Sequence, residues 1–448
     1  MTPGPAFSLH RVAVSSAWRW LFFVGFAIST TMVPLTMWAQ ASTDAEVMTS
    51  QPLISPIHAP APAEGSPMFE LMPPDKTGIV MNYPIEPNHS LNRLYPYGWA
   101  AGGVAIGDIN GDGKADLFFA GGPVANRLFT QVGDFQFLEV TTRAGISGGD
   151  RWCAGAAMAD IDNDGDLDIY VTCYGESNLL FINQSEGNEI RFEENAEKQH
   201  LDSRDGSLNA AFADFDRDGA LDLFVQTYHL EPEDGRPEKS PGINLQGGIP
   251  LIEDQWSPYY VAFRGQGEQL AWTESGRPDY FLRNKGFSFF EDFSEASGMA
   301  LGRTHGTSLT WCDVDHDGFP DLYVGNDRND PDLFYRNSQQ KTLIEATSQA
   351  FPHTPWNARG TVAADFNNDL LVDLLSANAG GLSATDDLAL GFPQTADRIA
   401  MLNTGGAPQV ARNHLLINTG AARFIDTAWM SGLSHAGSVW STKAGDFD

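Results

Sequence analysis

The chain has 448 residues, of which 42% are hydrophobic and 11% aromatic, so it can build the core of one large domain or of several ordinary ones. Its 45 glycines and 26 prolines favour many short strands and turns over long helices. The net charge of −31 excludes nucleic acid and anionic membrane surfaces as favourable partners, because both would repel the protein.

The N-terminal segment has the pattern of an export signal. Arg11 and Arg19 precede an apolar stretch, residues 20–38, and Ala39-Gln40-Ala41 offers a small-residue cleavage site. The sequence therefore predicts a signal peptide over residues 1–41. The mature protein is expected to be exported, to the extracellular space, the cell surface or the periplasm.

The alternative for this segment is an uncleaved anchor, since the apolar stretch is nearly long enough to span a bilayer. Pro34 and the Ser-Thr-Thr at 29–31 favour cleavage, after which no membrane span is expected. Residues 42–67 are rich in Pro, Ala and Ser and show no hydrophobic periodicity, so we interpret them as a linker.

An Asp-rich stretch of nine residues then recurs along the chain, and it is clearest at Asp160–Asp168, DIDNDGDLD. It places side-chain oxygens at positions one, three, five and nine and a Gly at position six. Ca²⁺ takes about six to eight oxygen ligands in flexible geometry, and the Gly permits the sharp turn around the ion. We number these stretches loops one to five; they start at Asp108, Asp160, Asp214, Asp313 and Asp365, and AGDFD at the chain end opens a sixth.

Each loop belongs to a repeat with a common order of segments. A small-residue segment such as AGAAMA leads into the loop, an apolar segment such as IYVTC leaves it, and a third segment such as NLLFIN follows. A fourth segment contains Phe and often ends in Thr and Ala-Gly. Four short strands per repeat predict an all-β fold, a β-propeller of four-stranded blades with the small first strand near the central axis.

The regular spacing of the loops is interrupted by two insertions, residues 226–278 and roughly 379–412. The EF-hand alternative is excluded, because position twelve of the loops is never Glu and the flanking segments are strand-like rather than helical.

These repeats resemble the FG-GAP/VCBS repeats of integrin α-subunit propellers, on phrases such as GGVAIGDINGDGKADLFFAGG and DVDHDGFPDLYVGND. Residues 68–448 as a whole resemble the bacterial relatives of cartilage acidic protein, the ASPIC/UnbV family. The resemblance implies a seven-bladed propeller, often followed by a C-terminal ASPIC/UnbV domain. About five blades are complete in this chain, so we expect a fragment of a longer product, cut in the sixth blade. Phe69–Ile79 is expected to be the outer strand of the last blade, and 438–448 a lone inner strand.

The resemblance also implies a Ca²⁺ ligand set, namely the side chains at positions one, three, five and nine and the carbonyl at position seven. Carried over to loops one to five in turn, these positions are Asp108, Asn110, Asp112, Lys114 and Asp116; Asp160, Asp162, Asp164, Asp166 and Asp168; Asp214, Asp216, Asp218, Ala220 and Asp222; Asp313, Asp315, Asp317, Phe319 and Asp321; Asp365, Asn367, Asp369, Leu371 and Asp373.

Four complete loops predict four Ca²⁺ sites with a structural role, because the metal removes the repulsion between neighbouring carboxylates. The alternative for one such loop is a solvated turn, but four copies in register favour the metal. Loop five departs from the pattern, since Leu370 replaces the Gly and would be strained if position six requires a positive φ. Its occupancy is left open.

Cys153 and Cys173 lie at equal distances on either side of loop two, so they are expected to face each other across a hairpin. A disulfide and a pair of small buried thiols are both compatible with that position. Cys312 precedes loop four where the other repeats have Ala, and we interpret it as a small core residue.

Strand alternation places the Asp loops on one face of the propeller and both insertions on the opposite face. Loops on a rigid scaffold commonly carry function, and aromatic side chains suit sugar rings or protein anchors. The candidate ligand-binding residues of the first insertion are Trp256, Tyr259, Tyr260, Arg264 and Trp272. The alternative is that these aromatic residues pack a small core of the insertion itself.

The sequence therefore predicts an exported calcium-binding propeller that serves as an extracellular adhesion or recognition module for protein or carbohydrate. No G-x-S-x-G, H-E-x-x-H or P-loop motif is present, and no catalytic residue is assigned. The alternative function is a propeller-fold polysaccharide lyase or hydrolase acting on the insertion face. The oligomeric state is left open.

Overall fold

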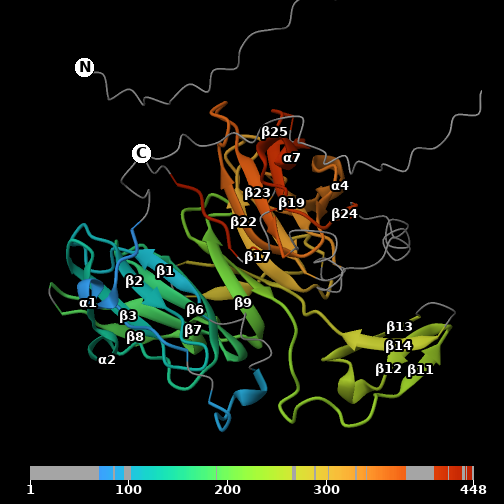
Figure 1. Ribbon diagram of the computed structural model, residues 1–448, viewed down its shortest axis with the longest axis horizontal. Coiled ribbons are helices and arrows are strands. Elements are labelled where there is room, and N and C mark those ends of the chain that lie inside the picture. Colours follow the sequence, from blue (N-terminus) through green and yellow to red (C-terminus); the bar gives the residue numbers. More distant parts are fainter. Residues whose placement is uncertain are drawn as a thin grey trace, which may run out of the picture. The chain divides into compact units, whose positions relative to one another are not determined.

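The computed structural model describes part of one compact unit, Ile54–Asp448 (Figure 1). The described residues are 70–83, 86–94, 102–187, 189–264, 269–286, 289–300, 302–327, 330–339, 341–379, 408–421, 423–435, 439 and 441–445. The predicted signal peptide, the linker, most of the second insertion and Asp446–Asp448 lie outside them. None of the helices in the described ranges is long and apolar enough to cross a membrane.

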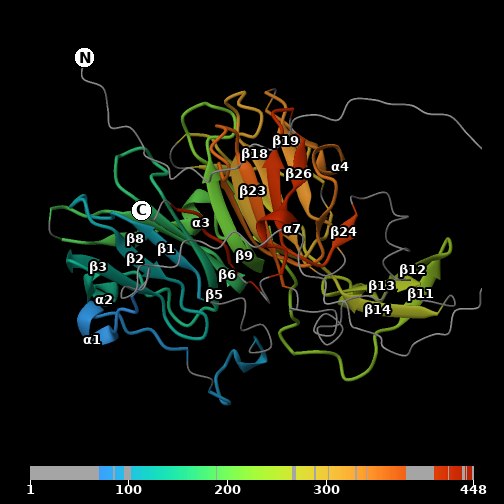
Figure 2. The ribbon, with the colours of Figure 1, turned by 45° about the horizontal axis from the view of Figure 1, so that its top comes forward.

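The described fold is all-β, and its repeating element is an antiparallel meander of four strands (Figures 1 and 2). Unit one contains β1 Val104–Gly107, β2 Asp116–Phe119, β3 Arg127–Gly133 and β4 Gln136–Glu139; unit two, β5 Cys153–Ala159, β6 Asp168–Ser177, β7 Leu179–Asn183 and β8 Phe192–Glu194; unit three, β9 Arg204–Ala213, β10 Asp222–Thr227, β15 Tyr280–Asn284 and β16 Phe290–Asp292; unit four, β17 Gly306–Cys312, β18 Asp321–Asn326, β19 Leu333–Asn337 and β20 Leu343–Glu345; unit five, β22 Ala358–Ala364, β23 Asp373–Asn378, β25 His414–Asn418 and β26 Phe424–Asp426.

The four segments expected in every repeat thus form strands in the expected order. Pairing of β6 with β9 joins all eight strands of units two and three into one sheet. The fourth strand is short, and in four units a one-turn helix follows it: α2 Thr141–Ala144, α3 Ala196–Gln199, α4 Thr347–Ala350 and α7 Ala428–Ser431.

The hydrophobic core lies between consecutive units. One buried cluster joins Phe118 and Leu128 of unit one to Ile169 and Val171 of unit two. Equivalent clusters connect units two and three, three and four, and four and five. The second strands supply much of this core, since β10 and β18 are buried along their whole length. Because both faces of these strands are covered, they are apolar runs rather than alternating segments.

The small first strands lie side by side in the order β1, β5, β9, β17, β22. Glycine is needed there because the strands approach closely: a Cβ on Gly103 would lie 2.6 Å from the Cα of Gly155, and one on Gly155 would lie 2.4 Å from the carbonyl oxygen of Leu208. All five first strands line one cavity of about 540 Å³. The crowding expected of the small-residue segments is therefore confirmed.

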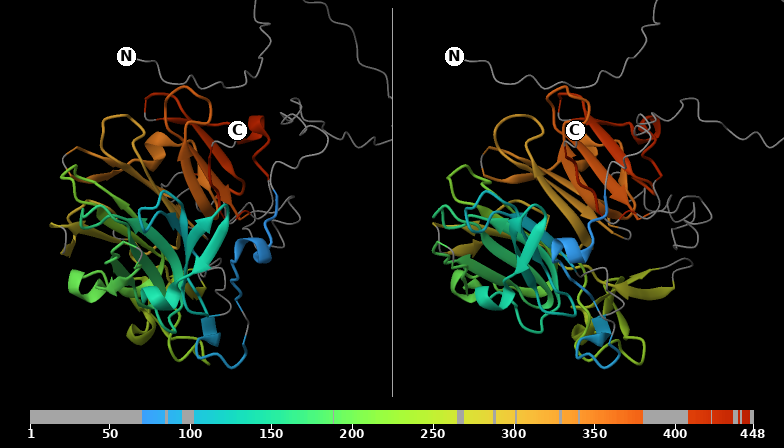
Figure 3. Two further views of the ribbon diagram at one scale, coloured as in Figure 1. Left: turned by 90° about the vertical axis from the view of Figure 1, so that its left-hand side faces the viewer. Right: turned by 60° about the vertical axis from the view of Figure 1, so that its left-hand side comes forward.

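The segment expected to be an outer strand at Phe69–Ile79 is not a strand in the described part, Glu70–Ile79, and that prediction was wrong. It forms the one-turn helix α1, Pro74–Thr77, which packs beside β4. The helix is part of the blue segment in Figure 3. Pro74 starts the turn without losing a helical hydrogen bond, and Gly78 ends it with φ 76°. This segment nevertheless resembles the end of unit one in its structure, because α2 also ends at a glycine in the left-handed conformation, Gly145.

The C-terminal segment also differs from the expected strand. Residues 441–445 carry no strand assignment, although Ser441 lies against β22, with its Cα 2.8 Å from the position of a Cβ on Gly360. The segment therefore follows the first strand of unit five without joining its hydrogen-bond ladder.

Cys153 and Cys173 face each other across β5 and β6, as predicted. Both are buried thiols, with their Sγ atoms 2.9 Å apart. Burial together with the neighbouring Cys153 thiol raises the pKa of Cys173. Cys312 is buried in the core between units four and five, which confirms its interpretation.

Candidate metal sites

Each Asp loop connects the first and second strands of its unit, which confirms the strand-like flanks. Position six has a positive φ in every loop, with values of 81°, 99°, 87° and 85° at Gly113, Gly165, Gly219 and Gly318. Leu370 of loop five has φ 73°, so the strain expected there is present. Loop five therefore adopts the same backbone conformation as the other loops, although it lacks the glycine that favours a positive φ.

Position one organises the turn through its carboxylate. In loop two, Asp160 Oδ1 accepts a hydrogen bond from the Asp164 N–H at 3.1 Å, and its Oδ2 accepts one from the Gly165 N–H at 3.0 Å. Corresponding bonds to positions five and six occur in all five loops. These bonds curl the backbone around the position-one carboxylate.

Position nine anchors the loop to the sheet. Asp168 is buried; its Oδ2 accepts the Ile161 N–H at 3.1 Å and its Oδ1 accepts the Asn183 N–H at 2.8 Å. Burial raises the pKa of Asp168 to about 7, and likewise those of Asp222 and Asp321. A bound cation would oppose this shift by favouring the ionised form.

Predicted ligand side chains converge in three loops. Oxygen atoms of the following carboxylates lie within 4.8 Å of one another: Asp160, Asp162 and Asp168 in loop two, Asp214, Asp216 and Asp218 in loop three, and Asp313, Asp315 and Asp321 in loop four. In loop one, Lys114 instead forms an ion pair with Asp112 at 3.0 Å. The donors are all oxygens, the chemistry that hard cations such as Ca²⁺ prefer.

Basic side chains that the loop pattern did not reveal reach two of these loops. Arg283 and Lys341 both form ion pairs with Asp216, the Lys341 contact measuring 3.0 Å, and Arg336 pairs with Asp315. Both arginines stand just before the Asn that ends the third strand. Units one, two and five have Thr130, Ile182 and Ile417 there. A closer comparison of the third segments would have exposed this difference.

The predicted ligand-binding residues of the first insertion are found in and around two hairpins. These are β11 Ile243–Gln246 with β12 Ile249–Ile252, and β13 Tyr260–Arg264 with β14 Leu270–Glu274. Trp256, Tyr259 and Trp272 are half-buried and pack with buried Tyr260, whose ring centroid lies 4.8 Å from that of Trp272. Arg264 is exposed. The alternative arrangement, a small core of the insertion itself, is therefore the one found.

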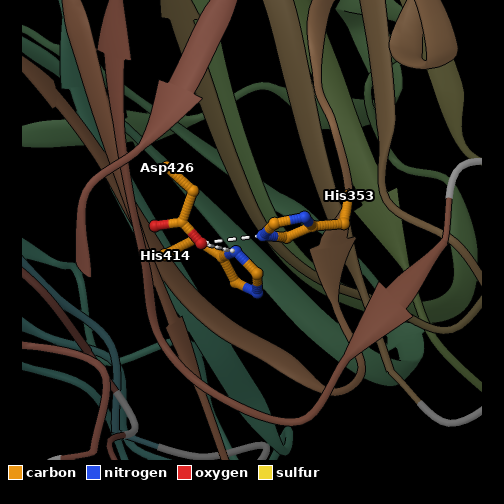
Figure 4. A group of neighbouring side chains, drawn as sticks. All are labelled: His353, His414 and Asp426. Carbon is orange, nitrogen blue, oxygen red and sulfur yellow. Dashed lines mark hydrogen bonds and ion pairs between the residues drawn. The ribbon is translucent and has the colours of Figure 1, made fainter. Parts of the chain in front are cut away.

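A second kind of cluster lies at the end of unit five, where three side-chain nitrogen atoms contact Asp426 Oδ2; two of them, from His353 and His414, are drawn in Figure 4. His353 Nε2 lies at 2.7 Å, His414 Nδ1 at 3.0 Å and Arg412 Nη2 at 2.7 Å. Burial would raise the pKa of Asp426, but the hydrogen bonds from both histidines hold it below its usual range. Because the guanidinium and both histidines contact the same oxygen of a single carboxylate, this cluster is a hydrogen-bonded ion pair rather than a cation site.

Comparison with known proteins identifies the repeat. A family model described as FG-GAP-like repeat matches residues 108–171 and 313–376, which contain loops one, two, four and five. Cartilage acidic protein 1 of Xenopus tropicalis is 29% identical over 122 residues, 27% of this chain and 19% of that protein. The human protein is 28% identical over 153 residues, 34% of this chain and 23% of that protein. The chain thus spans about a quarter or less of the length of these relatives.

Two solved structures show weaker likeness. One is a lectin of Agrocybe aegerita that recognises non-reducing terminal N-acetylglucosamine; it is 14% identical, covers 73% of this chain and 79% of its own, and has a TM-score of 0.32. The other is the biofilm matrix protein Bap1 of V. cholerae, 14% identical over 64% of this chain and 36% of its own, with a TM-score of 0.20. These TM-scores are too low to assign a ligand.

Proposed function

We propose that the chain, which contains FG-GAP-like repeats and is similar over part of its length to cartilage acidic protein 1, is a calcium-stabilised β-propeller that acts outside the cell as a recognition and adhesion module. The observation that carries the proposal is the convergence of carboxylates in loops two, three and four. In each loop these groups hold the same place between the first and second strands of the unit.

The propeller part of the proposal is supported by three features of the described units. The strands of each unit follow one another as a meander, the core lies between consecutive units, and the five first strands line a common cavity. A radial array of blades has all three properties, because each blade packs face to face with the next and places its first strand at the axis. Seven blades would complete the ring.

The calcium part rests on the donor set and on charge. Carboxylates a few ångströms apart repel each other, by about 1 kcal/mol per pair in water and by more when partly buried. When bound, Ca²⁺ supplies the compensating charge and ties positions one, three, five and nine to one point. The chain's own contribution is to hold the carboxylates in place through the backbone N–H groups of positions five and six.

The recognition part concerns the first insertion, and its ligand class is a protein or a carbohydrate. Both hairpins expose apolar side chains, notably Leu245 and Ile249 on the first and Val261 and Phe263 on the second. Exposed apolar groups on a rigid frame are suited to binding a partner. Removal of residues 240–275 should abolish binding on a glycan or protein array while leaving the calcium content unchanged.

Calorimetry tests the calcium role directly. A ligand that binds only the native state stabilises it by mass action, so EDTA should lower the melting temperature and added Ca²⁺ should restore it. Asp162→Ala should remove one equivalent of bound Ca²⁺, while Asp234→Asn, at an exposed position outside the loops, should remove none. Identical melting curves with EDTA and with Ca²⁺ would show that the loops have no structural metal.

A further inference from the structure

A buried cluster at the base of the first insertion contains a different set of donor atoms. His229 lies two residues beyond the end of β10 and forms an isolated bridge with Gly276. Glu231 follows it, and Glu274 is the last residue of β14. Donor atoms of His229, Glu231 and Glu274 lie within 4.8 Å of one another. The side chains of His229, Glu231 and Glu274 have exposed fractions of 0%, 6% and 12%.

The tautomer of His229 is set by its neighbour. Its Nδ1 lies 3.1 Å from the carbonyl oxygen of Ser275, which can only accept, so Nδ1 carries the hydrogen. In the neutral ring the lone pair of Nε2 then points towards Glu231 Oε2, 3.4 Å away. A metal-binding histidine is oriented in this way when its other ring nitrogen donates to a backbone carbonyl.

The distance between His229 Nε2 and Glu231 Oε2 distinguishes the His229 cluster from the cluster around Asp426. A charge-assisted N–H···O bond measures about 2.7–2.9 Å, and two of the three contacts to Asp426 fall in that range. The 3.4 Å between His229 Nε2 and Glu231 Oε2 is longer. It equals the edge of a tetrahedron around Zn²⁺, about 3.3–3.4 Å for bonds of about 2.0–2.1 Å.

Arg236 contacts the same carboxylates from the outside. It reaches Glu231 Oε1 at 3.3 Å and Glu274 Oε1 at 2.5 Å. The guanidinium thereby fixes one oxygen of each carboxylate, and Glu231 turns its other oxygen towards His229. In the Asp426 cluster, by contrast, the Arg and both histidines share a single oxygen.

Tyr260 provides an independent observation. It pairs directly with Glu274 across β13 and β14, so both side chains lie on the same side of the hairpin. As a residue Tyr260 is 98% buried, and its hydroxyl has no hydrogen-bond partner among the described residues. Burial raises the pKa of Tyr260 to about 12, and the charges of Glu231 and Glu274 add to this effect. A buried hydroxyl without a partner is unfavourable, and a bound cation would remove that cost.

We propose that His229, Glu231, Glu274 and Tyr260 form a structural Zn²⁺ site that closes the base of the first insertion. One nitrogen and three oxygen donors from three chain segments fill a four-coordinate shell, which leaves no open position for chemistry. The metal ties the two ends of the insertion to its second hairpin and restricts the entropy of the segment between them. This site is separate from the Asp loops in both position and donor type.

The test uses the full chain saturated with Ca²⁺, so that the Asp loops do not take up the probe. After Zn²⁺ addition and dialysis, elemental analysis should find one equivalent of Zn²⁺ in the wild type. Tyr260→Phe keeps the ring that packs on Trp272 and removes only the oxygen, and it should weaken Zn²⁺ binding about tenfold or more. Glu231→Gln should abolish it. Asp254→Asn, an exposed acid of the same insertion, should change nothing.

Substitution with Co²⁺ adds a readout that does not depend on the amount of metal retained. The wild type should show the intense visible absorption of four-coordinate Co²⁺, and Glu231→Gln should lose it. If the wild type retains no Zn²⁺ in the presence of Ca²⁺, the cluster is a hydrogen-bonded histidine–carboxylate–guanidinium network and the proposal is wrong. Unchanged Zn²⁺ affinity in Tyr260→Phe would likewise refute the four-donor site. Neither result would bear on the calcium loops, whose occupancy is measured separately.

Discussion

Asn183 at the end of β7 donates its side-chain amide to the carbonyl oxygen of Ile109, the second residue of loop one, at 2.9 Å. Among the described residues, loops two, three and four are joined to the next unit in the same way. The pairs are Asn284 with Ile161 at 3.3 Å, Asn337 with Phe215 at 2.9 Å and Asn418 with Val314 at 2.8 Å. A loop and the unit that follows it therefore stabilise each other.

Asn183→Ala should lower the free energy of unfolding by about 1–3 kcal/mol, because it leaves the buried carbonyl of Ile109 and the partly buried carbonyl of Leu167 without that donor. Urea denaturation monitored by fluorescence would measure the change. Asn244→Ala, at an exposed position of β11, is the matched control and should have no measurable effect. Equal stability of the two variants would show that the link between units contributes nothing.

Leu370→Gly should stabilise the protein by up to about 1 kcal/mol, because it relieves a left-handed backbone at a side chain that is 82% exposed and loses little packing. It should also raise the Ca²⁺ affinity of loop five. The reciprocal change, Gly219→Ala, has the same backbone conformation and no atom within 4 Å of the added Cβ, so it should destabilise through strain alone. Differential scanning calorimetry of the pair would reveal opposite shifts; shifts of the same sign would contradict the argument.

Arg336→Gln should increase the Ca²⁺ affinity of loop four, because the guanidinium paired with Asp315 competes with the cation. Removal of one positive charge near 4 Å is worth about 1 kcal/mol in water, or about fivefold in affinity. Isothermal titration calorimetry would measure the change. Arg127→Gln removes a cation that pairs with Glu139 away from the loops, so it serves as the control. An affinity no higher than that of the control would mean that Arg336 does not compete.

Asp279→Asn should flatten the pH dependence of stability. Burial raises the pKa of Asp279 to about 7, and its Oδ1 accepts the Thr227 N–H. As pH rises from about 4 to about 7, the unfolded chain releases this proton while the native state keeps it, so the free energy of unfolding falls and the loss is complete above about pH 7. At the position of Asp279, units one, two and five have Asn126, Asn178 and Asn413. The side-chain oxygen of each accepts a hydrogen bond from a backbone N–H, as Asp279 does.

The variant should therefore gain more stability over wild type at about pH 8 than at about pH 5, as measured by urea denaturation at a fixed Ca²⁺ concentration. Asp332→Asn should behave similarly, since burial raises the pKa of Asp332 to about 7 as well. Asp234→Asn, at an exposed position, should leave the pH profile unchanged. A gain independent of pH in Asp279→Asn would contradict a protonated Asp279 in the native state.

Much of the described fold could be predicted because its signals are local. Loop positions one, six and nine specify a turn by side-chain oxygens and a positive φ, and the apolar runs on either side specify strands. Repetition of these signals fixed the strand order in every unit. The helix at Pro74–Thr77 was missed because its sequence resembles a fourth strand with the turn that follows, and a strand forms only where a neighbouring strand accepts its hydrogen bonds.

The amino-acid sequence by itself determined where each Asp loop lies, which residues it offers to a cation, and which loop carries a strained Leu370. Only the tertiary structure decided that Arg283 reaches Asp216, that Asn183 reaches Ile109, and that His229 meets Glu274. The physical reason is the range of the interactions. Turns and strands arise from neighbouring residues, whereas these contacts join residues tens of positions apart, and no local pattern records which side chains the packing of the units will bring together.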